Sequence, residues 1–146
     1  MGYIFSASKL NLLELEKYRM PIIIACKNSA IIQAIEDQYQ LININILLSQ
    51  RLIDYDIKQR NQQALIEINN ILTLPGDKVY LKRYQVLFTP QYGINVLKLF
   101  CEIAKQRHIA VRWCGQISDR TLVYSIPESK DYNMYQIDDY DVICLI

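Results

Sequence analysis

Hydrophobic and polar positions along the chain follow two periods, one typical of buried strands and one typical of helices. Residues 22–26 form a continuous apolar run that begins with three isoleucines, which predicts a strand buried on both faces of a parallel sheet. From Ile31 to Tyr39 the apolar residues recur at helical spacing. Asn28 or Ser29 can cap this helix. We therefore expect a buried strand that runs directly into an amphipathic helix.

The same two periods predict the remaining elements. Further strands are expected at residues 41–46, around 79–81, 109–114, 122–126 and 142–146. Further helices are expected at residues 8–19, 47–58, 60–72 and 95–106. Strands that alternate with helices imply parallel pairing and right-handed crossovers. The sequence thus predicts one α/β domain over residues 1–146, with an N-terminal helix in 1–20, C-terminal strands in 121–146 and the strand at 22–26 near the centre of the sheet.

Composition supports one globular domain. The 146 residues are 51% hydrophobic and 21% charged, which is enough for a core and argues against disorder. The apolar runs are too short to span a bilayer, so we expect a cytoplasmic protein. The four cysteines, with no C-x-x-C spacing, and the single histidine predict free thiols in a reducing compartment and no metal site.

The turn between the first buried strand and its helix is the most informative candidate site. In a nucleotide-binding α/β domain, this turn carries glycines whose backbone N–H groups wrap the phosphates, followed by a lysine. Here the turn reads Cys-Lys-Asn-Ser at residues 26–29, and all four glycines of the chain lie elsewhere. The sequence therefore predicts the scaffold of a nucleotide-binding domain without its nucleotide chemistry.

Four stretches of the chain resemble one known family. These are Tyr-Leu-Lys-Arg-Tyr-Gln-Val-Leu-Phe at 80–88, Arg-Trp-Cys-Gly at 112–115, Leu-Val-Tyr-Ser at 122–125 and Tyr-Asn-Met-Tyr at 132–135. In their order, they resemble the BrxF family, the P-loop-containing component of type III BREX anti-phage systems. The resemblance covers most of the chain after residue 20. It implies a P-loop-NTPase-like (Rossmann-like) fold, with a mostly parallel sheet flanked by helices.

The departures from the family pattern fall at the nucleotide site. Lys27 lies in a shortened loop, Asn28 stands where the family has lysine, and only Ser29 can replace the magnesium-binding Ser/Thr. Lys82 stands at the position of the family's magnesium-binding acid, and Gln85 at that of a glutamate. Mg²⁺ is held by carboxylates and phosphates, and phosphoryl transfer depends on such positioning. These five residues therefore predict a vestigial nucleotide site with no catalytic residue, no metal and no cofactor.

The resemblance implies an adaptor or regulatory subunit of a BREX-like defence complex. Its partners would be a large ATPase, a DNA methyltransferase or a phosphatase-like protein.

The alternative is a small nucleic-acid-binding module that uses a basic stretch. Residues 78–120 hold eight Lys/Arg against two acids, whereas residues 121–146 hold one lysine against five acids. Arg83, Arg112 and Trp113 are the candidates for contact with a protein partner or DNA. Each has a structural alternative, because the basic and acidic segments can neutralise each other and Trp113 can be a core side chain.

Overall fold

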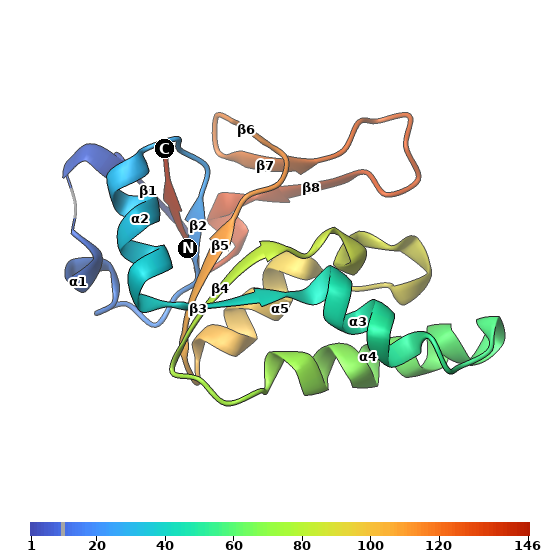
Figure 1. Cartoon of the computed structure of the whole chain (residues 1–146). Coiled ribbons are helices and arrows are strands. Elements are labelled where there is room, and N and C mark those ends of the chain that lie inside the picture. Colours follow the sequence, from blue (N-terminus) through green and yellow to red (C-terminus); the bar gives the residue numbers. More distant parts are fainter. Residues whose placement is uncertain (10) are drawn as a thin grey trace.

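A six-stranded parallel sheet forms the centre of the computed structural model, which describes residues 1–9 and 11–146 (Figure 1). The strand order is β1-β9-β2-β5-β4-β3, so β2 lies between β9 and β5. The strands are β1 (Tyr3–Phe5), β2 (Ile22–Ile24), β3 (Gln40–Asn43), β4 (Lys78–Arg83), β5 (His108–Arg112) and β9 (Ile143–Leu145). The predicted α/β class, the mostly parallel sheet and the central position of the first buried strand are confirmed.

Helices cover both faces of this sheet. They are α1 (Leu12–Leu15), α2 (Ser29–Gln38), α3 (Ile44–Leu52), α4 (Ile57–Leu72) and α5 (Val96–Ala104). Short 3-10 helices lie at Ala7–Lys9, Gln85–Phe88, Pro90–Tyr92 and Ile137–Asp139. Helices α1 and α2 pack on the face formed by Ile22, Ile24 and Tyr80, which we call the α2 face. Helices α3, α4 and α5 pack on the opposite face, against Ile23 and Val111 among others.

A small antiparallel sheet joins β5 to β9. Its strands are β6 (Gln116–Ser118), β7 (Thr121–Tyr124) and β8 (Asn133–Gln136). Leu122 and Tyr135 bury their side chains against the main core, at 0% and 4% exposure. A Cβ atom at Gly115 would collide with the backbone carbonyl of Val123, so the entry to this sheet requires glycine. No helix in the described part of the chain is long and apolar enough to cross a membrane.

The structure differs from the sequence prediction near the N-terminus. In place of one helix over residues 8–19, it has a 3-10 turn at Ala7–Lys9 and the short helix α1, and Leu10 lies outside the described residues. The cap is Asn11, whose side chain accepts the backbone N–H of Glu14, and not Ser8. Strand β1 precedes both, and the pattern of the sequence did not predict it.

Two other boundaries were predicted wrongly because side chains end the elements early. The strand predicted over residues 41–46 ends at Asn43, whose Oδ1 accepts the N–H of Ile46 and starts α3. The break between the next two helices lies before Asp56 and not near Gln59, because Asp56 caps α4 by accepting the N–H of Gln59. Strands β6 and β8 were not predicted.

Candidate functional site

The carboxyl ends of β2, β5 and β4 lie side by side at one end of the sheet, which we call its carboxyl end (Figure 1). From β2 the chain passes to α2 on one face, whereas after β5 it enters the small antiparallel sheet and returns as β9 on the other side of β2. In open α/β sheets, ligands bind in the crevice that such a change of direction creates. The candidate site therefore lies between the β2–α2 turn and the end of β5.

The β2–α2 turn is closed by its own asparagine. The Oδ1 atom of Asn28 accepts the backbone N–H groups of Ala30 at 3.0 Å and Ile31 at 3.2 Å. These are the unpaired donors that a helix N-terminus offers to an anion. Lys27 is exposed before the cap, and Ser29 is the first helical residue and also exposed. Of the two predicted caps, Asn28 is the one that caps the helix, and its side chain accepts two of the N–H groups that a helix N-terminus would otherwise offer to an anion.

Two side chains bind backbone groups beside this turn: Arg112 at the end of β5 and Tyr84 directly after β4. The Nη1 atom of Arg112 donates to the carbonyl of Cys26 at 2.6 Å, which joins the ends of β5 and β2. The hydroxyl of Tyr84 donates to the carbonyl of Arg112 at 2.7 Å and accepts the N–H of Cys114 at 3.2 Å. Burial raises the pKa of Tyr84, which is 0% exposed, so the hydroxyl stays neutral and keeps its proton for donation.

Gln85 is held in a structural clasp with α3. Its Oε1 atom accepts from Nδ2 of Asn45 at 2.8 Å and from the backbone N–H of Tyr84 at 3.1 Å. Asn45 in turn accepts the N–H of Val86 at 3.0 Å. The two amides thus tie the start of α3 to the segment after β4, on the side of that strand that lies away from β2.

Lys82 lies on the α2 face and lines a groove of about 320 Å³ together with Glu36 and Leu41. Strand β5 separates its strand from β2. Of the five residues predicted for a vestigial nucleotide site, the structure therefore brings Lys27, Asn28 and Ser29 together on one turn. Lys82 and Gln85 lie elsewhere along the carboxyl end of the sheet, where Lys82 lines the groove and Gln85 binds Asn45.

Trp113 is a packing residue in this structure. Its side chain is 6% exposed, and its indole N–H donates to the carbonyl of Gln116 at 3.0 Å. Its ring meets those of Phe88 and Tyr135 edge to face, with centroid distances of 6.2 and 6.4 Å. Trp113 therefore joins the two sheets. Of the three predicted contact residues, Arg83 is the exposed one, at the carboxyl end of β4.

The basic stretch at residues 78–120 does not form one surface. Lys78, at the start of β4, forms an ion pair with Glu16 at 2.8 Å, whereas Arg83 lies at the carboxyl end of the same strand. Arg120, between β6 and β7, binds Asp138 in the 3-10 helix after β8, and its hydrogen bonds hold the pKa of that carboxyl below its usual value. Part of the basic stretch is thus neutralised within the fold.

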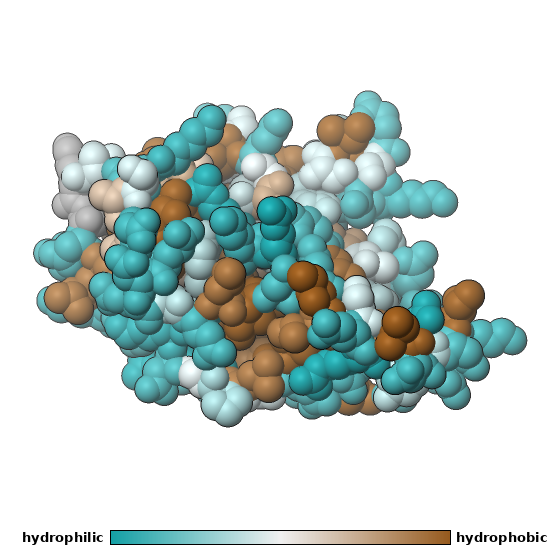
Figure 2. All heavy atoms as spheres, viewed as in Figure 1, coloured by the Kyte–Doolittle hydropathy of each residue, from teal (hydrophilic) through white to brown (hydrophobic). Residues whose placement is uncertain are grey.

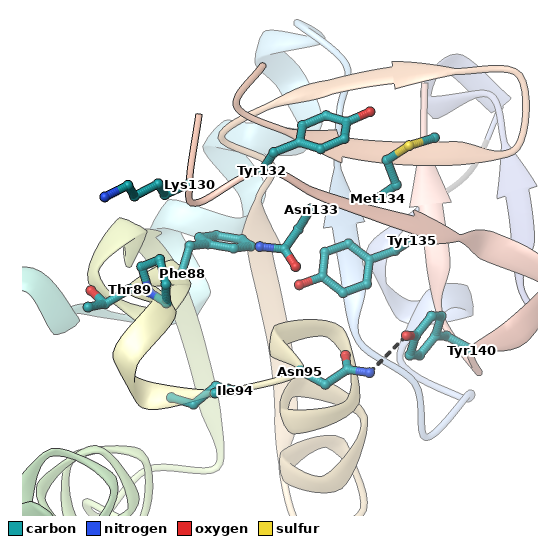
Figure 3. Close-up of a pocket in the computed structure, with 12 residues that line it drawn as sticks. Phe88, Thr89, Ile94, Asn95, Lys130, Tyr132, Asn133, Met134, Tyr135 and Tyr140 are labelled. Carbon is teal, nitrogen blue, oxygen red and sulfur yellow. Dashed lines mark hydrogen bonds between the residues drawn. The ribbon is translucent and has the colours of Figure 1, made fainter. Parts of the chain in front are cut away.

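A cavity that sequence reasoning missed lies where the N-terminus of α5 meets β8 (Figure 3). Its volume is about 460 Å³, and it is lined by Thr89, Asn95, Asn133, Tyr135 and Tyr140 among others. Asn95 donates to the Tyr140 hydroxyl at 2.9 Å, the contact dashed in Figure 3. Burial raises the pKa of Tyr135 to about 12. The tyrosine content of residues 132–135 was visible in the sequence, but without β8 their position was not.

Metal-binding and thiol chemistry find little support in the geometry. Within residues 1–9 and 11–146, no three His, Cys, Asp or Glu side chains lie close enough to hold a metal ion. Cys144 is 0% exposed, and burial raises its pKa to about 12; burial also raises the pKa of Cys101 to about 11. Neither is therefore a ready thiolate at neutral pH.

Comparisons of the chain with protein-family models, with curated proteins and with solved structures found no match.

Proposed function

We propose that this chain is a non-catalytic, P-loop-like adaptor or regulatory subunit of a bacterial anti-phage complex of the BREX type. One observation carries the proposal. A nucleotide-binding domain of this kind would hold phosphates between the β2–α2 turn and the end of β5. Here the side chain of Asn28 accepts hydrogen bonds from two helix N–H groups, and Arg112 donates to the carbonyl of Cys26. The defence context rests on the sequence resemblance alone.

Three features of the carboxyl end of the sheet disfavour phosphoryl transfer. The donors that would bind phosphate oxygens are already bound, so a triphosphate would have to displace an intramolecular hydrogen bond. Lys82, which stands where the family pattern has an acid, lies on β4 beyond β5 and brings no carboxylate to the turn. Gln85 is neutral and is bound to Asn45, so it supplies neither charge nor a free carboxylate.

The surface supports a role in binding other proteins. Apolar side chains gather where β3 leads into the α3–α4 hairpin, as Figure 2 shows. The exposed ones on these elements and their connection are Leu41, Ile46, Ile53, Ile57, Leu65 and Ile66, between 51% and 79% exposed. Clustered apolar side chains on a protein surface mark interaction sites. The partners that the resemblance implies are a large ATPase, a DNA methyltransferase or a phosphatase-like protein.

Co-expression of the tagged protein with its genomic neighbours, followed by affinity purification and mass spectrometry, tests the proposal. We expect one of these partners in stoichiometric amount, with loss on Ile53→Lys/Ile57→Lys and retention with Lys105→Gln, a change at the other end of the molecule. In parallel, the purified protein should not turn over ATP. Turnover that disappears on Lys27→Ala would overturn the non-catalytic assignment.

A second candidate function is nucleic-acid binding, which one observation favours. Three basic side chains are exposed at the carboxyl end of the sheet: Lys27, Lys82 and Arg83. Binding to phosphates would weaken steeply with salt, and the slope of log affinity against log salt would fall by about 0.9 for each phosphate contact removed. Fluorescence anisotropy with Lys82→Glu/Arg83→Glu, against Lys105→Glu as the control, measures this. Absence of any salt-dependent binding at low ionic strength excludes it.

A further inference from the structure

Strand β3 forms one edge of the parallel sheet, and within residues 1–9 and 11–146 its one partner strand is β4. Proteins usually protect such an edge with a lysine, a proline or a covering segment. The sequence of β3 is Gln-Leu-Ile-Asn, which carries neither charge nor proline, and its Leu41 side chain is 58% exposed. At the opposite edge, by contrast, the ring of Tyr3 in β1 lies 6.2 Å from that of Tyr18, next to α1.

The α2 face beside this edge is hollowed. The groove of about 320 Å³ that Lys82 lines also contains Glu36, Tyr39, Leu41 and Tyr80. Tyr39 and Tyr80 are 5% and 1% exposed, so they form an aromatic floor. Glu36 lies near the end of α2, which leads directly into the start of β3, whereas Lys82 lies near the carboxyl end of β4. The groove therefore has an acidic end toward the start of β3 and a basic end toward its carboxyl end.

We propose that β3 pairs antiparallel with β3 of a second copy of this chain, so that two six-stranded sheets form one continuous sheet. A two-fold axis perpendicular to the sheet relates the copies and makes the interface self-complementary. This axis keeps both α2 faces on the same side of the joined sheet.

The alternation of side chains fixes the register. Residues directly opposite each other in an antiparallel pair point to the same face. Leu41 points to the α2 face and Ile42 to the other face, where it is buried. Leu41 can therefore lie opposite Leu41 of the second copy but not opposite Ile42. The register shift at Ile42/Asn43 also limits regular pairing to the first part of β3, which centres the interface on Leu41.

The charges suit a second copy better than a strand of one charge sign. In the antiparallel arrangement, the carboxyl end of one β3 lies beside the start of the other. The basic end of each groove then faces the acidic end of the neighbouring groove, so Lys82 approaches Glu36 of the second copy twice. A uniformly acidic or basic partner strand would meet a like charge at one of the two ends. The dimer shares Leu41 with the apolar surface described above for a protein partner, but none of its contacts involves the β2–α2 turn, Ile53 or Ile57. Sedimentation of the purified chain alone therefore tests the dimer separately from the adaptor function.

Sedimentation velocity over about a hundredfold range of protein concentration tests the dimer. We expect a concentration-dependent monomer–dimer equilibrium for the full chain. Leu41→Glu places two carboxylates on the axis and should raise the dissociation constant by more than about tenfold. The matched control is Ile126→Glu, at an isoleucine that is 60% exposed and follows β7 of the small sheet, outside the interface. A monomer at every concentration, or an equal loss with the control, would overturn the proposal.

Charge exchange and cross-linking test the register. Glu36→Lys and Lys82→Glu should each weaken the dimer, and the double exchange should restore it. Opposed residues in an antiparallel pair have Cα atoms about 4.5–5.5 Å apart, which suits a disulfide. Leu41→Cys should therefore give a covalent dimer on mild oxidation, whereas Ile126→Cys and the natural chain should not. A dimer that persists in Leu41→Glu and does not cross-link at residue 41 uses another surface and refutes the register.

Discussion

Replacing Tyr84 by phenylalanine removes one oxygen atom from the buried side chain that links β4 to the end of β5. The ring contacts with Phe100 at 5.5 Å and Phe88 at 6.2 Å would remain. The carbonyl of Arg112 and the N–H of Cys114 would each lose the hydroxyl as a hydrogen-bond partner. A buried polar group left without a partner costs about 1–3 kcal/mol. We take about 1 kcal/mol for each, and therefore expect Tyr84→Phe to lower the free energy of unfolding by about 2 kcal/mol.

Urea unfolding followed by circular dichroism measures this change. The midpoint should fall while the slope with urea stays constant, because the mutation leaves the surface exposed on unfolding unchanged. For a domain of this length, about 2 kcal/mol corresponds to a fall in Tm of roughly 6–8 °C. Tyr18→Phe, at a side chain that is 43% exposed, is the control and should change neither. The backbone amide of Cys114 should also exchange its hydrogen faster in Tyr84→Phe. A loss below about 0.5 kcal/mol would show that the hydroxyl does not hold the end of β5.

Three further predictions concern other groups described above. Asn28→Ala removes the cap of α2 and should cost about 1 kcal/mol in thermal unfolding, whereas Asn28→Asp should retain the cap. Gln85→Ala breaks the clasp with Asn45 and should cost about 1–2 kcal/mol; the double variant with Asn45→Ala should cost less than the sum of the single variants in urea unfolding. Because the folded-state pKa of Cys144 is raised to about 12, its contribution to stability is present below the usual thiol pKa and is lost as pH rises toward 12. Mass spectrometry after iodoacetamide treatment at pH about 8.5 should therefore find Cys144 unlabelled in the folded protein and labelled in denaturant.

The strand and helix around the candidate site could be predicted because their signals are local. Three consecutive isoleucines form β2, and Asn28 stands directly before the helix that it caps. The boundary between β3 and α3 could not be read in the same way. Ile42, Ile44 and Ile46 alternate with asparagines and so imitate a strand, but Asn43 caps the helix. The second asparagine of that alternation, in α3, bonds to the segment after β4, a contact that the local pattern does not contain.

The contacts that close the site depend on residues far apart in the chain. Arg112 and Cys26 are 86 positions apart, and Tyr84 reaches Cys114 across 30. The sequence marked the missing glycines of the turn and the basic residue at 112, but not that the two would meet. Strand β8 escaped prediction because it contains one buried side chain, Tyr135, and its other three residues are polar or exposed. A strand of this composition is defined by its pairing with β7 and not by its own pattern.

The groups that occupy the expected phosphate site also hold the sheet together. Asn28 stabilises the start of α2, Arg112 joins the ends of β5 and β2, and Tyr84 fixes the backbone beyond β5. A nucleotide-binding domain leaves such donors unpaired until the ligand arrives, and part of the binding energy then depends on them. Here the same donors contribute to folding without a ligand. Binding of a nucleotide at this turn would therefore require breaking contacts that stabilise the fold, and for this reason we propose an adaptor role and not a weakened enzyme.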